Sequence, residues 1–276
     1  MEIRFSKMHG LGNDFVVIDA INQQLDLTAA QIRFLADRHF GVGCDQLLLV
    51  ERPVNANADF EYRIFNADGG EVSQCGNGAR CFARFVRDKK LSAKDEIVVD
   101  TNAGQLVLYF ASAEAITVNM GIPRHQPMQI PVLMPEESSL YHVGLGEKTI
   151  DFAAVSMGNP HAVITVDNVE LAPVDTVGWQ LEQHPVFPER ANIGFMQIVD
   201  RNHIRLRVYE RGAAETLACG SGACAAVVAG IEQGLLEHSV TVSLPGGELQ
   251  INWQGRGQPV NMTGPAVLVY EGQIRL

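Results

Sequence analysis

Cys75-Gly-Asn-Gly-Ala79 and Cys219-Gly-Ser-Gly-Ala223 are two copies of one short pattern, and this duplication decides the fold. Each copy follows the expected end of a strand and a turn, and it precedes a run that favours a helix. A paired pattern of this kind predicts that each cysteine lies at the first turn of a central helix. Because both copies share the same surroundings, we expect the two cysteines to occupy equivalent places in two similar domains.

Further segments repeat in the same order along the chain. They pair Gly12–Ile18 with Gly158–Ile164, Ile97–Gly104 with Val240–Gly247, and Val118–Met120 with Val260–Met262. A repeat this long predicts two similar domains rather than a solenoid. We expect one domain over residues 1–119, to which 265–276 return as a strand, and a second over 120–264. The predicted fold class is α+β, with two pseudo-symmetric domains, each a β-rich sheet or barrel wrapped around a central helix.

Local patterns predict the individual elements. Thr28 and Gln31 form a capping-box signature, and a helix is expected from there to about residue 39. Further helices are predicted over 76–89 and 220–236, the second buried because it is small and apolar on nearly all sides. Most of the remainder favours strands: 15–19, 46–50, 62–65, 97–100, 105–110, 116–119, 162–166, 195–199, 204–208, 240–244, 248–253 and 266–270.

Composition excludes several classes of function. The 276 residues carry a formal net charge of −11, which argues against nucleic-acid binding, since that depends on clustered cations. The longest apolar stretch, 223–231, is too short to cross a bilayer. The first residues lack the pattern of a secretory signal, so we expect a cytoplasmic protein whose five cysteines are free thiols.

The two cysteine turns indicate proton-transfer chemistry. A helix N-terminus stabilises a thiolate, and its free N–H groups can also bind a carboxylate. The glycines at 76, 78, 220 and 222 would let the backbone approach a ligand closely. Two such cysteines on opposite faces of one carbon would act as base and acid, which is the requirement for inverting a stereocentre. Cys44, Cys81 and Cys224 are expected to be buried structural residues.

At this point the sequence resembles the diaminopimelate epimerase family over essentially its whole length. The motifs that carry the resemblance are Gly10-Leu-Gly-Asn-Asp-Phe15, Gly43-Cys-Asp-Gln46, Cys75-Gly-Asn-Gly-Ala-Arg80, Gly158-Asn-Pro-His161 and Ala218-Cys-Gly-Ser-Gly-Ala223. The resemblance implies interconversion of LL- and meso-2,6-diaminopimelate, a step toward lysine and peptidoglycan precursors. It also implies that neither pyridoxal phosphate, another cofactor nor a metal takes part, and that the protein is a homodimer.

The resemblance assigns roles to individual residues. Cys75 and Cys219 would be the catalytic pair, His161 and Glu210 would tune the thiol pKa values, and Tyr270 would lie at the dimer contact. The substrate-binding residues would be Asn13, Gln46, Asn66, Gly76, Asn77, Asn159, Asn192, Glu210, Arg211, Gly220 and Ser221. Arg211 offers a bidentate fork for a carboxylate, and Glu210 offers an anionic partner for an ammonium group. Asn66 in the first repeat is matched by Glu210 in the second, and this asymmetry would distinguish the two ends of the substrate.

Two other functions remain open at this stage. A proline or hydroxyproline racemase would share the fold and the paired cysteines, although the Arg211/Glu210 pair favours a substrate with two amino-acid ends. Cys75 and Cys219 could instead form a redox-switched disulfide in a binding protein. Loss of turnover in a Cys219→Ser variant would distinguish the epimerase from the binding protein.

Overall fold

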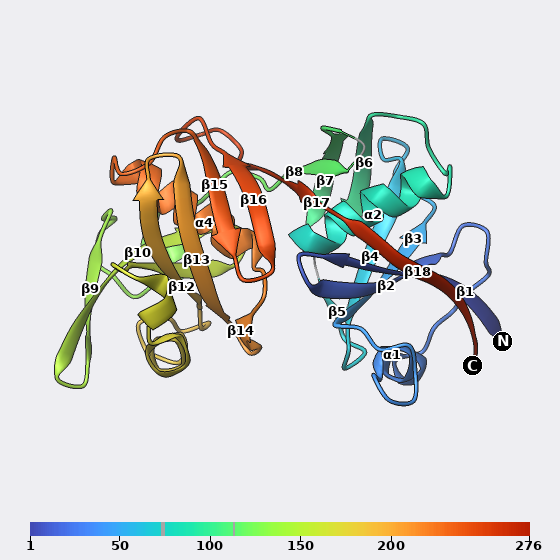
Figure 1. The fold of residues 1–276 in the computed structure, drawn as a ribbon, viewed down its shortest axis with the longest axis horizontal. Coiled ribbons are helices and arrows are strands. Elements are labelled where there is room, and N and C mark those ends of the chain that lie inside the picture. The colour runs from blue at the N-terminus through green and yellow to red at the C-terminus, as the bar shows by residue number, and fades with distance from the viewer. Residues whose placement is uncertain (73–74, 113) are drawn as a thin grey trace. The chain divides into compact units, whose positions relative to one another are not determined.

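The chain folds into two compact units. The computed structural model describes residues 1–72, 75–112 and 114–276. Unit 1 comprises Met1–Asn119 together with Thr263–Leu276, and unit 2 comprises Met120–Met262. The elements of both units are labelled in Figure 1.

Unit 1 is built mainly of strands. Its elements are β1 (Glu2–Gly10), β2 (Asn13–Asp19), α1 (Ala29–Ala36), β3 (Gln46–Glu51), β4 (Phe60–Asn66), β5 (Glu71–Val72), α2 (Gly76–Asp88), β6 (Glu96–Thr101), β7 (Gly104–Phe110), β8 (Ala115–Asn119) and β18 (Val267–Arg275). From β1 the strands pair antiparallel with β2, parallel from β2 to β3, antiparallel from β3 to β4, parallel from β4 to β6, and antiparallel from β6 to β7.

Unit 2 repeats this order of pairings. Its elements are η1 (Pro127–Gln129), β9 (Tyr141–Leu145), β10 (Lys148–Ser156), β11 (Pro160–Thr165), η2 (Val169–Leu171), η3 (Val174–Gly178), α3 (Trp179–Glu182), β12 (Asn192–Asp200), β13 (His203–Glu210), β14 (Ala214–Thr216), α4 (Gly220–Glu232), β15 (Ser239–Leu244) and β16 (Gly247–Asn252), while β17 (Asn261–Pro265) spans the boundary between the units. From β10 the pairings run antiparallel to β11, parallel to β12, antiparallel to β13, parallel to β15 and antiparallel to β16.

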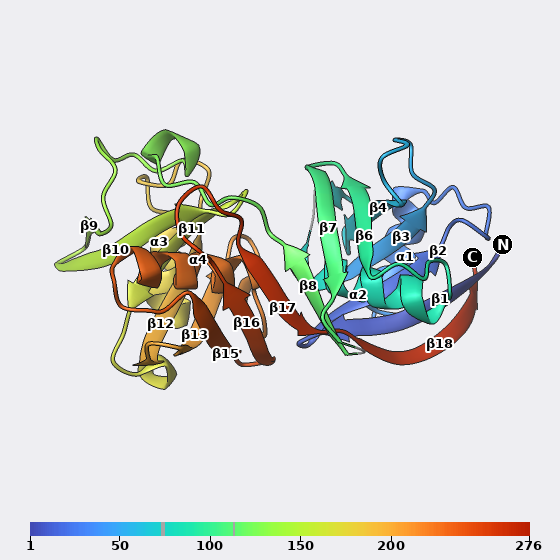
Figure 2. The same cartoon turned by 90° about the horizontal axis from the view of Figure 1, so that it is seen from above.

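Each unit encloses one central helix. In unit 1, α2 packs against β1, β2, β3, β7, β8 and β18, and in unit 2, α4 packs against β10, β11, β12, β13 and β16. Figures 1 and 2 show each helix among the strands of its own unit. Ten of the thirteen residues of α4 are buried, in keeping with its small apolar composition. The predicted α+β class, with strands wrapped around a central helix, is confirmed.

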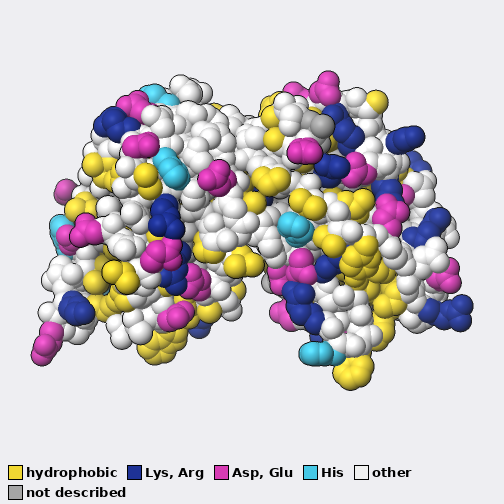
Figure 3. All heavy atoms as spheres, viewed as in Figure 1, with side chains coloured by type: hydrophobic (Ala, Val, Ile, Leu, Met, Phe, Trp, Pro, Cys, Tyr) yellow, Lys and Arg dark blue, Asp and Glu magenta, His cyan; other side chains and the backbone are white. Residues whose placement is uncertain are grey.

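Strand β18 lies beside the first strand of the chain. It pairs antiparallel with β1 from Glu2 opposite Arg275 to His9 opposite Val267. Hydrophobic side chains gather over this strand in Figure 3, and Val267, Val269 and Tyr270 are exposed. Tyr270 packs edge-on against Phe5, with the ring centroids 6.1 Å apart. The sequence pattern had predicted only the first half of this strand, because its remaining residues are largely polar.

Two helices end earlier than their sequence patterns predict. Helix α1 ends at Ala36 because Asp37 adopts an extended backbone, and its carboxylate accepts from the backbone N–H groups of His39 and Phe40. Helix α4 ends at Glu232, and Gly234 then takes a left-handed conformation with φ of 72°.

The sequence patterns do not predict strands β1, β9 and β10, nor the short strands β5, β14 and β17. In β1 two consecutive polar residues, Ser6 and Lys7, break the alternation of apolar and polar residues, and both of them are buried. The second half of β10 is buried on both faces, so it shows no alternation either. None of the helices in the described part of the chain is both long enough and apolar enough to cross a bilayer.

Candidate active site

The two predicted catalytic cysteines occupy the same structural position. Cys75 is the N-cap of α2, with φ −145° and ψ 121°, and Cys219 is the N-cap of α4, with φ −112° and ψ 104°. Their carbonyl oxygens accept the first helical hydrogen bonds, from Ala79 at 2.8 Å and from Ala223 at 2.9 Å. Each cysteine therefore lies at the N-terminus of a helix, where the first backbone N–H groups have no hydrogen-bond partner within the helix.

Cys219 is held beside a carboxylate in unit 2. The residue is 3% exposed, and its sulfur donates to Glu210 Oε2 at 3.1 Å, while the hydroxyl of Thr216 donates to Glu210 Oε1. Burial, and then the negative charge of Glu210, raise the pKa of the Cys219 thiol well above its usual value. The N–H of Gly222 acts in the opposite sense but does not outweigh them. Cys219 is therefore a thiol at neutral pH.

His161 reaches the same neighbourhood through hydrogen bonds. Its Nε2 lies 3.0 Å from Asn159 Oδ1, and Asn159 Nδ2 donates to Ser221 Oγ at 3.3 Å. Ser221 Oγ in turn lies 3.7 Å from the sulfur of Cys219. Burial, followed by the charge of Arg211, lowers the pKa of His161 to about 3, so the ring is neutral and can donate from one nitrogen only. His161 can thus act on Cys219 through Asn159 and Ser221.

Cys75 has amide neighbours in unit 1. Its sulfur donates to Asn13 Oδ1 at 3.7 Å, and the same oxygen accepts from Asn77 Nδ2 at 3.3 Å. The buried hydroxyl of Tyr62 donates to the carbonyl of Cys75 at 3.3 Å and fixes the backbone at this cap. Cys75 is half-buried, so the residue is more exposed than Cys219.

Gln46 and Asn66 form a second contact group in unit 1. They face each other across β3 and β4, and Gln46 Nε2 donates to Asn66 Oδ1 at 2.9 Å. Both side chains are half-buried at the strand ends. The register of the sheet therefore joins two predicted substrate-binding residues that lie far apart in the sequence.

Asn192 and Arg211 are joined in unit 2. Asn192 is buried, its Oδ1 accepts from the backbone N–H of Arg211 at 3.0 Å, and its Nδ2 donates to the carbonyl of Pro160 at 3.1 Å. Asn192 thus braces the turn that carries Arg211. The guanidinium of Arg211 is exposed and donates from Nη1 to the carbonyl of Glu189 at 3.0 Å, which leaves further N–H groups for a ligand.

Comparison with known proteins agrees with the family resemblance of the sequence. A family model described as diaminopimelate epimerase matches residues 5–126 and 153–269. The chain is 58% identical over 276 residues to the diaminopimelate epimerase of Teredinibacter turnerae and 59% identical over 276 residues to that of an Azoarcus species, covering all of each protein. This chain belongs to the diaminopimelate epimerase family. It is accordingly an isomerase of the epimerase class.

Solved structures show how widely this epimerase fold occurs. A probable proline racemase from Agrobacterium radiobacter superposes with a TM-score of 0.72 at 16% identity, covering 99% of this chain and 93% of its own. At that level of identity the likeness concerns the fold alone.

The described residues hold no group of three or more His, Cys, Asp or Glu side chains arranged to bind a metal ion.

Two of the glycines in the cysteine turns have close neighbours within their own unit. A Cβ added at Gly78 would lie 2.6 Å from the hydroxyl oxygen of Tyr62. One added at Gly222 would lie 3.1 Å from Val208 Cγ2 and 3.2 Å from the sulfur of Cys219. Contacts within the protein therefore disfavour a side chain at both positions, most strongly at Gly78.

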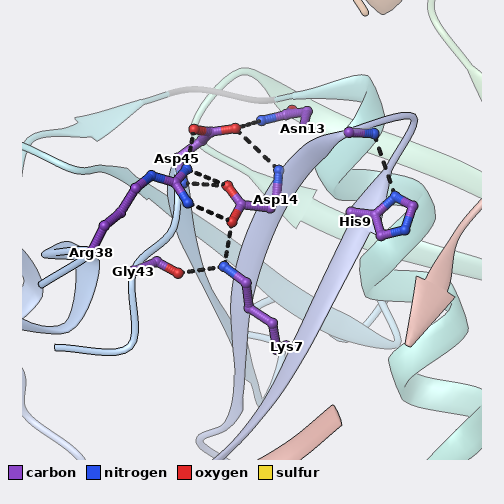
Figure 4. A network of polar contacts seen from close by, with 8 residues as sticks. Lys7, His9, Asn13, Asp14, Arg38, Gly43 and Asp45 are labelled. Atoms are coloured by element: carbon purple, nitrogen blue, oxygen red, sulfur yellow. Dashed lines mark hydrogen bonds and ion pairs between the residues drawn. The ribbon is translucent and has the colours of Figure 1, made fainter. Parts of the chain in front are cut away.

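The sequence reasoning missed an ionic network next to Asn13. Asp45 Oδ2 accepts from Asn13 Nδ2 at 3.0 Å, and Arg38 donates to both Asp45 and Asp14 (Figure 4). Lys7 pairs with Asp14 and donates to a backbone carbonyl. Burial raises the pKa of Asp14, but hydrogen bonds from Arg38 and Lys7 hold it well below its usual range. The charged residues that adjoin Asn13 and Gln46 in the sequence were the available signal.

Proposed function

We propose that this epimerase interconverts LL- and meso-2,6-diaminopimelate by moving one proton between Cys75 and Cys219. The observation that carries the proposal is the matched placement of the two cysteines at helix N-caps, with Cys219 beside the carboxylate of Glu210. The substrate is taken from the name shared by the full-length relatives. The product would then serve lysine and peptidoglycan synthesis.

The reaction divides into a deprotonation and a protonation. In one direction of the reaction Cys75 reacts as a thiolate and is the base that removes the α-proton from one face, while Cys219 is the thiol. The electron pair of the broken C–H bond is shared with the α-carboxylate. Cys219 then gives its proton to the opposite face of the same carbon and becomes a thiolate. The two sulfurs exchange these roles in the reverse direction, and the pair titrates as a unit.

The remaining residues bind and orient the substrate. Backbone N–H groups of Gly76, Asn77, Gly220 and Ser221 would bind the reacting carboxylate, whose negative charge grows as the proton leaves. Arg211 would hold the distal carboxylate with N–H groups that do not reach Glu189. Asn13, Gln46, Asn66, Asn159, Asn192 and Glu210 would fix orientation by hydrogen bonds.

Deuterium exchange tests this function directly. Purified protein without added cofactor is incubated with LL-diaminopimelate in deuterated water, and the products are separated and examined by NMR. We expect meso product that carries deuterium at the inverted centre. Inversion of proline without action on diaminopimelate, or inversion without deuterium, would contradict the proposal.

We also propose that the enzyme is a cytoplasmic homodimer that associates through β18. Five cysteines without disulfides suit a reducing compartment. The exposed side chains of Val267, Val269 and Tyr270 form an apolar strip on this strand that a second copy would cover. A Tyr270→Glu variant should sediment as a monomer, whereas an exposed leucine in unit 2, Leu171→Glu, should leave the dimer intact. A wild-type chain that sediments as a monomer would contradict the assignment.

A further inference from the structure

A chain of hydrogen bonds runs through the Cys75 half of the site and ends on a charged side chain at each end. Arg80 Nη2 donates to Asn77 Oδ1 at 2.9 Å, and Asn77 Nδ2 donates to Asn13 Oδ1 at 3.3 Å. Asn13 Nδ2 then donates to Asp45 Oδ2 at 3.0 Å, and Arg38 donates to Asp45 Oδ1 at 2.7 Å. Figure 4 shows the part of this hydrogen-bond chain that joins Asn13 through Asp45 to Arg38.

The ends of this chain fix the direction of both amides. A guanidinium can only donate and an ionised carboxylate can only accept, while a side-chain amide can do either from opposite ends. Turning over the Asn13 amide would place its oxygen against the Asp45 carboxylate and its NH₂ against that of Asn77. Turning over Asn77 would place its NH₂ against Arg80. Arg80 is fully buried and Asn77 is 3% exposed, so water cannot repair such a mismatch.

Asp45 is itself held in place. Its Oδ2 accepts from the backbone N–H of Asp14 at 3.1 Å, and its own N–H donates to Asp14 Oδ1 at 2.9 Å. Arg38 bridges the two carboxylates, and Lys7 adds a second cation beside Asp14. Asp45 is partly exposed, yet these reciprocal bonds keep its carboxylate directed at Asn13.

We propose that Asp45 and Arg80 are positioning residues that fix the orientation of the Asn13 and Asn77 amides, so that Asn13 presents its carbonyl oxygen to Cys75. The sulfur of Cys75 lies 3.7 Å from that oxygen. The relevance to turnover rests on the proposed function, in which Cys75 is one of the two proton carriers. The geometric claim concerns Cys75 alone and can be measured without substrate.

The first test is an Asp45→Asn variant. Its new NH₂ can face Asn13, which removes one of the two contacts that oppose turning over the Asn13 amide and leaves only the contact with Asn77. The turned amide presents Nδ2 to Cys75, where it stabilises a thiolate. In a Cys219→Ser background, the rate at which iodoacetamide alkylates the Cys75 peptide at pH 7.5 should rise about fivefold, which is the scale of one hydrogen bond. With both cysteines present, diaminopimelate turnover should fall about tenfold while KM changes less.

Loss of the negative charge of Asp45 would also speed alkylation, so the variant is repeated in an Asn13→Ala background. We expect less than about a twofold effect there, because the amide that carries the influence of Asp45 is absent. Equal effects of Asp45→Asn in both backgrounds would overturn the proposal. Asp45→Ala, which removes the acceptor altogether, should show the same dependence on Asn13 and serves if Asp45→Asn does not fold.

Asp59→Asn is the matched control. Asp59 likewise accepts from a backbone N–H, that of Val98, and pairs with a cation, Lys94, in unit 1. Its substitution should change neither the alkylation rate nor turnover. Because alkylation needs no substrate, a wild-type protein without diaminopimelate activity would count against the proposed function, and an unchanged alkylation rate in Asp45→Asn would count against the positioning role.

Discussion

The surroundings of Cys75 in unit 1 and of Cys219 in unit 2, here called the two half-sites, have the same backbone arrangement and differ in their side chains. Both cysteines are the N-cap residues of a central helix. The sulfur of Cys75 contacts Asn13, and that of Cys219 is linked through Ser221 to the corresponding Asn159. The parallel strand pairs place Gln46 opposite Phe15 in unit 1 and Asn192 opposite His161 in unit 2. The strand register therefore equates positions that sequence comparison alone matches only in part.

The side chains that differ give the two cysteines different electrostatic surroundings. In unit 2 the carboxylate of Glu210 lies where unit 1 has the neutral Asn66, and the neutral base His161 lies where unit 1 has Phe15. The hydrogen-bond chain at Cys75 ends on ions, which fixes its direction. The chain at Cys219 ends on an imidazole and a hydroxyl, each of which can donate or accept. In the proposed function, one fold duplicated in this way would supply both an acid and a base.

Replacing either sulfur should have the largest effect. Cys75→Ser and Cys219→Ser should each lower turnover about 10³-fold, because a serine hydroxyl is too weak an acid to exchange a proton at neutral pH. The measurement is the rate of isomer interconversion. Cys81→Ala and Cys224→Ala, which alter a buried cysteine in each helix, should retain near-normal rates. Substantial activity in only one of the two serine variants would mean that the half-sites are not both proton carriers.

Glu210→Gln should remove the main electrostatic difference between the half-sites. The pKa of Cys219 is raised by burial and by Glu210, so loss of the carboxylate charge should lower it and allow the thiolate to form at lower pH. In a Cys75→Ser background the pH profile of Cys219 alkylation should move to lower pH, and turnover of the otherwise intact enzyme should fall about 100-fold. Glu215→Gln, which loses a carboxylate paired with Arg207, is the control. An unmoved profile would refute the assignment.

The matched glycines should fail in different ways. Gly78→Ala forces a Cβ to within 2.6 Å of the buried Tyr62 hydroxyl, so we expect a loss of about 1–3 kcal/mol in the free energy of unfolding. Gly222→Ala contacts the Cys219 sulfur at 3.2 Å and should mainly lower turnover, by about tenfold, through displacement of that sulfur. Urea unfolding and kinetics on both variants distinguish these outcomes. The opposite pattern would show that the contacts do not govern the two positions.

His161→Phe should alter the pH dependence of stability, with its effect confined to pH values below neutral. The pKa of buried His161 is lowered to about 3, so between its usual value of 6.5 and about 3 the unfolded chain binds a proton that the folded chain does not. Stability therefore falls with decreasing pH in this window, by up to about 1.4 kcal/mol per pH unit. The phenylalanine found at the matched position of unit 1 should remove this part of the slope in urea titrations. His142→Phe, at an exposed site, should retain it.

The sequence by itself determined most of the helices and strands and the matched positions of Cys75 and Cys219. Small and apolar runs after each Cys-Gly-x-Gly turn predicted α2 and α4, and alternating residues predicted most of the strands, because both patterns depend on near neighbours in the chain. The Thr28–Gln31 capping box is present as predicted, for the same reason.

Only the tertiary structure decided which residues surround each sulfur. Lys7 and Ser6 are buried in β1 because segments remote in sequence pack over them, so no local pattern could identify that strand. The contacts of Asn13 with Asp45, and of Cys219 with Glu210, arise from strand register and from the turns that follow it. The contact with Asp45 orients the amide of Asn13, and the contact with Glu210 raises the pKa of Cys219. Both depend on distances in the folded chain that spacing along the sequence does not set.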